Sequence, residues 1–323
     1  MPFVWIVEIS HMTALAATQD SPLRPVANAL HGHQNIALWL LLGPPLAWFV
    51  VFYLLPLFAL LGQSVLTFDE FSMTVTNELS FDNFRTIITE PVNFDIFWRT
   101  FSMGVAVTIA CTILGYPLAY YMARYAGGRT KGLMYVGVML PMWASYIVKA
   151  YAWTVILSKE GVANWLVGGL GLTSVLDTLL AIPWIGGNTL STSNIGRFLV
   201  FVYMWLPFMI LPIQASLERI APNLLLASGD LGATRTRTFF RVTLPLSAPG
   251  IAAGSIFTFC LTFGDYIIPT LVGPSGDFLG AVVYKYQGAV GNMPLAAALT
   301  LIPVLVVSAW LWLAKKLGAF DAL

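Results

Sequence analysis

The stretch ERIAPNLLLASGDLGATRTRTFFRVTLPLSAP, residues 218–249, lies between two long apolar runs and must therefore leave the membrane that those runs predict. Ala221-Pro222 can start a short helix, because proline is tolerated at a first helical position. Gly232 stands where that helix would end on a left-handed residue. The stretch therefore predicts two helical arms joined at a glycine, and we call residues 218–249 the elbow.

The second arm of the elbow is expected over residues 234–243, with Phe239 and Phe240 on its apolar side. Pro245 and Pro249 are expected to stop this helix and to turn the chain back into the membrane. Such an elbow would present a rigid surface outside the membrane. An ordinary amphipathic loop helix lying at the membrane interface explains the spacing alone equally well.

The residue pattern of the elbow resembles a family motif. Ala227-Ser228, three residues, Gly232, nine residues and Val242-x-Leu244-Pro245 resemble the EAA loop of ABC-importer permease subunits, which docks into the cytoplasmic ATPase subunit. The flanking segments LPMWASYIVKAYAW (140–153) and FGDYIIPTLVGP (263–274) are similar to the spermidine/putrescine branch of those permeases. The combination is far more specific than any one piece.

The resemblance covers roughly residues 36–316, nearly the whole chain, with one clear departure. Leu226 stands where the family has the leading glutamate of the motif, so an ion pair between that glutamate and the ATPase is in doubt here. We expect coupling to use apolar packing together with Arg235 and Arg237 instead.

The resemblance implies an all-α polytopic membrane protein with six transmembrane helices of the type I ABC importer permease kind and both termini in the cytoplasm. It implies a bacterial cytoplasmic (inner) membrane location, surrounding membrane lipid and a second permease subunit that forms a heterodimer with this chain. Two ABC ATPase subunits and a periplasmic or extracellular substrate-binding protein complete the implied complex. A polyamine such as spermidine or putrescine is the first choice of substrate, with an opine, another amino-acid derivative or ferric iron as alternatives.

Composition excludes several function classes. The chain is 58% hydrophobic and 10% charged, against about 25% charged residues in soluble domains. Its net charge of +1 argues against a nucleic-acid partner. Cys111 and Cys260 lie in apolar runs and are expected to be small buried hydrophobes.

No catalytic or metal site is expected in the membrane core, because all three histidines (His11, His31 and His33) precede it. The only glycine-rich basic stretch, GGRTKG at 127–132, lacks the spacing of a phosphate-binding loop. We therefore expect no cofactor on this chain, with ATP and Mg²⁺ bound by the partner ATPase subunits.

The chain is expected to divide into a cytoplasmic, partly disordered tail (1–35) and a transmembrane permease domain (36–323). Met12 is an alternative start to Met1. Runs near the roughly 20 residues needed to cross a bilayer follow one another along the permease domain. They are 36–66, 100–123, 132–157, 196–217, 249–272 and 294–314. Pro269 predicts a kink or unwinding in the fifth run.

Charge sets the expected orientation, because cytoplasmic segments carry an excess of lysine and arginine. With a cytoplasmic N-terminus, ten of the sixteen basic residues lie inside: Arg24, Arg124, Arg129, Lys131, Arg219, Arg235, Arg237, Arg241, Lys315 and Lys316. Four lie outside: Arg85, Arg99, Lys159 and Lys285. The elbow is then cytoplasmic, so topology, motif and charge agree.

Asp265 is the main candidate for substrate contact. It lies in the apolar segment FTFCLTFGDYIIPTLVG, where a carboxylate is unfavourable unless it faces a cavity or a partner. Together with Tyr266 it offers charge and cation–π contact to an ammonium group. A structural pair with Lys149 or Arg197, or an outer position already in water, is an equally good interpretation.

Trp143 and Tyr151 in the third run are further candidates for the substrate pathway. An interfacial aromatic belt is the commoner reason for such residues. Lys149 in the same run is expected to have a structural role, because a cation repels a cationic substrate.

The residues expected to couple to an ATPase cluster around the glycine of the elbow. Glycine and alanine allow close backbone approach, and arginine can pair with acidic groups on a partner. The set is Leu226, Ala227, Gly232, Ala233, Thr234, Arg235 and Arg237. The alternative, that arginines only mark the cytoplasmic side, applies to Arg219 and Arg241.

Two rival classes are weaker. A secondary transporter should show inverted repeats or several charges near the midplane, and neither is clear here. A membrane enzyme would need a nucleophile or metal cluster, which a core without histidine does not favour.

Overall fold

The computed structural model describes residues 34–69, 71–274, 276 and 278–316. Met1, Met12 and all of the predicted tail except residues 34 and 35 lie outside the described residues. The chain divides into two compact units, residues 1–60 and 61–323.

The described part of the first unit is helical. Helix α3 (Gln34–Phe49) runs through Pro44 and Pro45 and continues into a π-helical turn (Val50–Leu54), after which α4 (Leu55–Gln63) begins. In the π turn the Leu55 N–H bonds the Val50 carbonyl, five residues earlier. The stretch Leu41–Gln63 is long and apolar enough to cross a membrane, as predicted.

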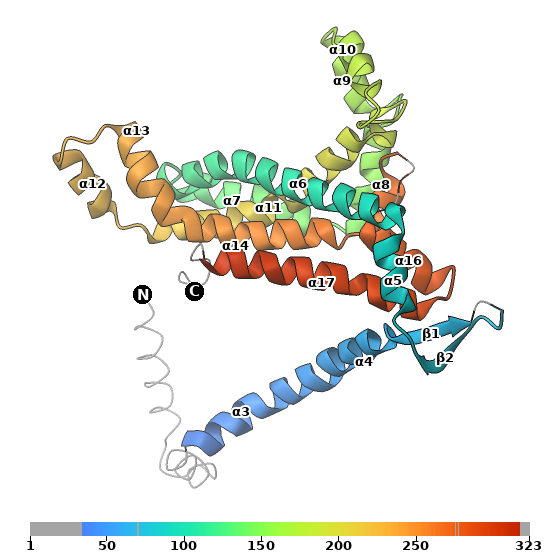
Figure 1. The fold of residues 1–323 in the computed structure, drawn as a ribbon. Coiled ribbons are helices and arrows are strands. Elements are labelled where there is room, and N and C mark those ends of the chain that lie inside the picture. Colours follow the sequence, from blue (N-terminus) through green and yellow to red (C-terminus); the bar gives the residue numbers. More distant parts are fainter. Residues whose placement is uncertain (1–33, 70, 275, 277, 317–323) are drawn as a thin grey trace, which may run out of the picture. The chain divides into compact units, whose positions relative to one another are not determined.

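The core of the second unit is a bundle of long helices (Figure 1). Helix α11 (Asn194–Arg219) packs against α6 (Pro91–Arg124) and α14 (Leu244–Phe263), and α17 (Met293–Lys316) packs against α14. Their contact faces bury large side chains completely, among them Met122, Phe201, Met209, Ile213 and Phe259. Cys111 is buried in the same core, as predicted, whereas Cys260 is only half-buried.

Small residues let α14 approach α11 closely, as is typical of helix pairs in membranes. A Cβ atom added at Gly250 would lie 2.6 Å from the Pro212 carbonyl oxygen of α11. At Gly254 it would lie 2.6 Å from the Met209 sulfur. These two glycines therefore set the distance between the central helices.

Gly250→Ala is expected to lower the free energy of unfolding by about 1–3 kcal/mol, the usual effect of overpacking, because a backbone oxygen cannot rotate away. Gly137→Ala is the matched control. No heavy atom lies within 4 Å of a Cβ at Gly137, which is also in a helix, so a change within about 0.5 kcal/mol is expected there. Thermal unfolding in detergent micelles measures both, and equal shifts would contradict this packing.

The third predicted span is broken in two. Helix α7 (Gly128–Trp143) and α8 (Tyr146–Ile156) meet at an angle of 94°, because Ala144 and Ser145 have extended backbone. The bend leaves the Pro141 carbonyl without its helical partner, and the Lys149 ammonium donates to it at 2.9 Å. The described residues hold five helices able to cross a membrane, or six if this bent pair is one span.

The expectation that Pro245 and Pro249 stop the second arm of the elbow is wrong. Helix α13 (Arg235–Thr238), a π-helical turn (Phe239–Thr243) and α14 form one continuous 29-residue helix. In the π turn the Leu244 N–H bonds the Phe239 carbonyl, five residues earlier. The hydrogen-bond spacing thus changes from four to five residues just before Pro245, which has no N–H to donate. The first unit places its π turn before Pro56 in the same way.

The predicted fifth span therefore begins earlier and ends earlier than residues 249–272. Helix α14 ends at Phe263, and Gly264, Asp265 and Tyr266 separate it from the short helix α15 (Ile267–Leu271). The unwinding expected from Pro269 lies just before α15, and Pro269 itself lies inside that helix.

Shorter elements connect the long helices. Strands β1 (Leu66–Asp69) and β2 (Thr74–Leu79) form an antiparallel hairpin that the sequence analysis did not predict. The Ser72 hydroxyl and the Phe71 N–H donate to Asp69 in its turn, and these bonds lower the pKa of that carboxyl. The other connecting elements are α5 (Asp82–Thr89), α9 (Val162–Gly169), α10 (Thr173–Leu180), a 3₁₀ turn (Leu190–Thr192) and α16 (Leu279–Gly288).

Candidate coupling elbow and substrate site

The elbow forms the helix–glycine–helix structure that its sequence predicts. Its first arm is α12 (Pro222–Asp230), which begins at a proline. Gly232 has φ of +76°, the left-handed conformation in which a side chain would be strained. Thr234 caps the second arm by accepting from the Arg237 N–H at 3.4 Å. A hydrogen bond between the hydroxyls of Ser228 and Thr238 joins the arms, so the elbow has a defined shape.

The outer side of the elbow is open. Leu226 and Leu231 expose 66% and 89% of their surface, large fractions for leucine. The other predicted coupling residues are also exposed, apart from half-buried Ala233: Ala227, Gly232, Thr234, Arg235 and Arg237. Neither arginine takes part in an ion pair among the described residues. The elbow thus presents an apolar and cationic surface.

The inner side of the elbow packs on the bundle. Phe239 meets the rings of Tyr116 and Tyr120 edge-on, with ring centroids 5.7 and 5.8 Å apart. The Tyr116 hydroxyl lies 3.0 Å from that of Ser247, in the first turn of α14. Aromatic pairs of this geometry contribute about 0.5–1.5 kcal/mol each beyond the area they bury. The second arm is therefore attached to α6 as well as to its own helix.

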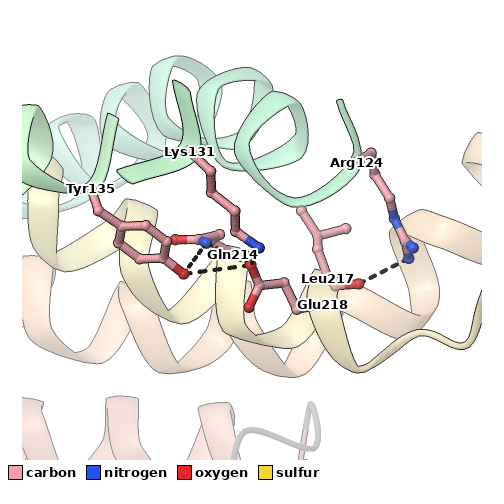
Figure 2. Close-up of polar contacts among 6 residues, drawn as sticks. All are labelled: Arg124, Lys131, Tyr135, Gln214, Leu217 and Glu218. Carbon is pink, nitrogen blue, oxygen red and sulfur yellow. Dashed lines mark hydrogen bonds and ion pairs between the residues drawn. The ribbon is translucent and has the colours of Figure 1, made fainter. Parts of the chain in front are cut away.

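A polar cluster lies at the base of the elbow, where α11 ends (Figure 2). Glu218 forms an ion pair with Lys131 of α7. Gln214 and Tyr135 donate to the same carboxylate oxygen, at 2.9 and 3.5 Å, and Gln214 also bonds the Tyr135 hydroxyl. Sequence reasoning interpreted Lys131 only as an orientation signal, because nothing in the sequence pairs residues 131 and 218.

Asp265 lies at the break between α14 and α15. Its carboxylate accepts from the Ile267 N–H at 2.8 Å and from the Tyr146 hydroxyl of α8. Tyr146 in turn stacks on Trp205 of α11, with ring centroids 5.8 Å apart. The carboxylate is half-buried and neighbours the Tyr146 ring of another helix. Tyr146 lies in the family-like segment 140–153, but no local signal connects it with Asp265.

The structure pairs Asp265 with neither of the cations weighed from the sequence. Lys149 bonds Pro141, as described above. Arg197, 1% exposed, donates to the carbonyls of Val272 at 2.8 Å, Pro274 at 3.1 Å and Pro269 at 3.3 Å. Arg197 therefore holds the carboxyl end of α15, while Asp265 accepts from its amino end.

The remaining pathway candidates are not brought together. Trp143 is 83% exposed at the end of α7, and Tyr151 is exposed on α8. Tyr266 stacks on Tyr284 of α16 with ring centroids 4.7 Å apart. Of these three residues only Tyr266 is a neighbour of Asp265, because it is the next residue in the chain.

A cavity of about 490 Å³ lies elsewhere in the second unit. Asp95, Arg99, Trp184, Asn194 and Phe278 are among its lining residues, and Asp265 is not. Asp95 and Arg99 form an exposed ion pair at 2.8 Å in its wall. The opposite charges of this pair therefore offset each other in the cavity wall.

A bundle of apolar helices with a rigid exposed elbow and a carboxylate at a helix break is the architecture of a membrane transport subunit. Residues 115–315 match the family of binding-protein-dependent transport system inner membrane components, and the chain belongs to this family. It is therefore a permease subunit of an ABC importer, multi-pass in the bacterial inner membrane, as the resemblance implied.

Relatives extend over nearly the whole chain. The inner membrane ABC transporter permease protein YdcU of Escherichia coli K12 is 57% identical over 308 residues, covering 94% of this chain and 98% of YdcU. The spermidine/putrescine transport system permease protein PotB of the same organism is 31% identical over 274 residues, covering 84% of this chain and 94% of PotB.

Solved structures share the fold. A crystal structure of a bacterial ABC transporter that imports the acidic polysaccharide alginate matches with a TM-score of 0.65 and 19% identity. The match covers 90% of this chain and 97% of that one. The type I importer permease fold, expected from the sequence, is thereby confirmed.

Proposed function

We propose that this chain forms half of the translocation pathway of an ATP-driven polyamine importer. The observation that carries this proposal is the half-buried Asp265 carboxylate at the break between α14 and α15. Among the described residues this carboxylate has hydrogen-bond donors but no cationic partner, and a charge in a membrane-spanning bundle is unfavourable unless it is paired or functional. The names of the PotB relatives, at about 30% identity, support the substrate class.

The chemistry around Asp265 suits an ammonium group. Tyr146 and the Ile267 N–H occupy part of the carboxylate, which has about four acceptor positions. Aromatic faces attract organic cations, and two aromatic residues adjoin the carboxylate: Tyr146 through its hydroxyl and Tyr266 as the next residue in the chain. A polyamine would therefore find charge, an acceptor and aromatic surface together.

The proposed complex contains a second permease chain as a heterodimer, two ABC ATPase subunits and a periplasmic or extracellular binding protein. The exposed apolar and cationic outer side of the elbow supports ATPase docking. A related alginate transporter was solved with its substrate-bound periplasmic protein, which supports the outer partner. The excess of basic residues at the elbow end supports cytoplasmic termini.

In this complex the chain couples ATP hydrolysis to transport and conducts the substrate, and the ATPase subunits bind ATP and Mg²⁺. ATP-driven closure of the ATPases pushes the two elbows together, and the helices convert that movement into outward opening. Leu226 replaces the glutamate of the family motif, so docking here depends on apolar packing and on Arg235 and Arg237.

Substrate-stimulated ATP hydrolysis tests the substrate class. The complex is reconstituted in proteoliposomes with its binding protein, which is loaded in turn with spermidine, putrescine, an opine or ferric iron. We expect a polyamine to stimulate ATP hydrolysis about tenfold and the other solutes not to stimulate it. Tenfold is about the lower end of the effect of one hydrogen bond to a charged group. Stimulation only by an opine or by iron would retain the importer and overturn the polyamine assignment.

A further inference from the structure

The cluster at the base of the elbow joins parts of the chain that are far apart in sequence (Figure 2). We call Lys131, Tyr135, Gln214 and Glu218 the brace. Glu218 lies in the last turn of α11, and the elbow's first arm begins at Pro222. Lys131 and Tyr135 lie in the first two turns of α7. The brace therefore connects the elbow to α7 through side chains alone.

The brace is built more firmly than a surface ion pair. Both charged side chains are about one-third exposed, and Gln214 is 1% exposed. Glu218 receives three donors, from Lys131, Gln214 and Tyr135. Exposed pairs contribute little because solvent screens them, but a carboxylate that three donors share, one of them the amide of the buried Gln214, holds its partners in one geometry.

A second contact fixes the same point. The Arg124 guanidinium, at the end of α6, donates to the Leu217 carbonyl at 2.9 Å and to the Ile220 carbonyl at 3.3 Å. These carbonyls lie at the end of α11, where Leu217 also accepts from the Ile220 N–H, and arginine is a natural donor at such an end. The end of α11 is thus attached to the chain on both sides of the α6–α7 turn.

Helix α7 then leads from the brace toward Asp265. Its 16 residues span about 24 Å at 1.5 Å per residue. Beyond the 94° bend, whose Pro141 carbonyl Lys149 holds, α8 begins with Tyr146. Tyr146 donates to the Asp265 carboxylate. One helix and one bend therefore separate the base of the elbow from the candidate substrate site.

We propose that the brace transmits movement of the elbow to α7, and through Tyr146 to the break at Asp265. The proposal rests on the proposed function, in which an ATPase moves the elbow. Glu218 and Lys131 act as positioning residues in this scheme. A purely structural brace would also stabilise the fold, so the test must measure movement as well as stability.

Labelling of a cysteine at the far end of α7 measures that movement. Ala144 is exposed at the bend and is replaced by cysteine in a Cys260→Ser background, Cys111 being fully buried. The complex with its ATPase is labelled with maleimide, without nucleotide and after trapping with ATP and vanadate. We expect trapping to change the labelling rate by about fivefold or more, the lower range of coupling between sites.

Glu218→Gln and Lys131→Gln should each abolish that change while vanadate trapping persists. The reversed pair, Lys131→Glu with Glu218→Lys, should restore it. Arg99→Gln is the matched control, because it removes one charge from an exposed ion pair that does not touch the elbow. The control should behave as the wild-type protein.

Single variants that keep the wild-type change in labelling would overturn the proposal. The proposal would also be overturned if the reversed pair regained wild-type thermal stability but not the change in labelling. The brace would then contribute to folding alone. A wild-type complex that traps no nucleotide would instead refute the proposed function, and the brace with it.

Discussion

Replacing Asp265 with asparagine is expected to lower spermidine uptake about 10- to 100-fold, because a hydrogen bond to a charged group is worth about 1.5–3 kcal/mol. Asparagine keeps the size of the side chain. Its oxygen can still accept from the Ile267 N–H, and its amide nitrogen then faces the Tyr146 hydroxyl and can donate to it. It removes the negative charge that would attract an ammonium group, together with one of the two acceptor oxygens. The ATPase should therefore remain bound and basal ATP hydrolysis should persist.

Two variants separate recognition from structure at this position. Asp265→Glu keeps the charge and should retain more uptake than Asp265→Asn. Tyr146→Phe removes the donor but leaves the carboxylate, so uptake should fall less than in Asp265→Asn. Uptake per folded complex is measured with radiolabelled spermidine, alongside thermal stability. Normal uptake by Asp265→Asn would contradict the role given to the carboxylate.

Gly232→Val is expected to lower ATP hydrolysis stimulated by the binding protein about 5- to 30-fold, the factor that corresponds to about 1–2 kcal/mol of left-handed strain. A β-branched residue at φ of +76° is a genuine outlier, so the turn must change shape and move the exposed residues on either side. The bundle does not touch this position, because no heavy atom lies within 4 Å of a Cβ at Gly232.

Gly229→Val is the matched control for the turn. Gly229 lies in α12, three residues away, with equally open space around it and without a positive φ. It should therefore retain most of the stimulated ATP hydrolysis. A further variant replaces Arg235 and Arg237 with alanine, which should weaken ATPase docking without altering the turn. Equal activity of the two valine variants would show that the shape of the elbow does not matter.

The elbow could be predicted from the sequence because its determinants are local. A proline starts α12, a glycine ends it and Thr234 caps the next arm. The long apolar spans could be predicted for the same reason, since a run of about 20 apolar residues is a strong local signal. The two prolines after the second arm misled the prediction, because a π turn and packing against α11 let the helix continue.

The parts that could not be predicted depend on contacts between distant segments. The break between α7 and α8 is stabilised by Lys149 on the Pro141 carbonyl, a bond that forms only once the chain has bent. Likewise Tyr146 lies 119 residues before Asp265, and Lys131 lies far from Glu218 in sequence. Spacing reveals which residues share a helix face, and it does not reveal which helices meet.

The most direct test of the central claim is ATP hydrolysis by the complex that purifies with this chain. The tagged chain is extracted from bacterial membranes, reconstituted in proteoliposomes and given ATP and Mg²⁺ with and without its loaded binding protein. We expect an ATPase to accompany the chain and its hydrolysis rate to rise when the binding protein is added. A chain that purifies without an ATPase, and moves solute regardless of ATP, would contradict the account.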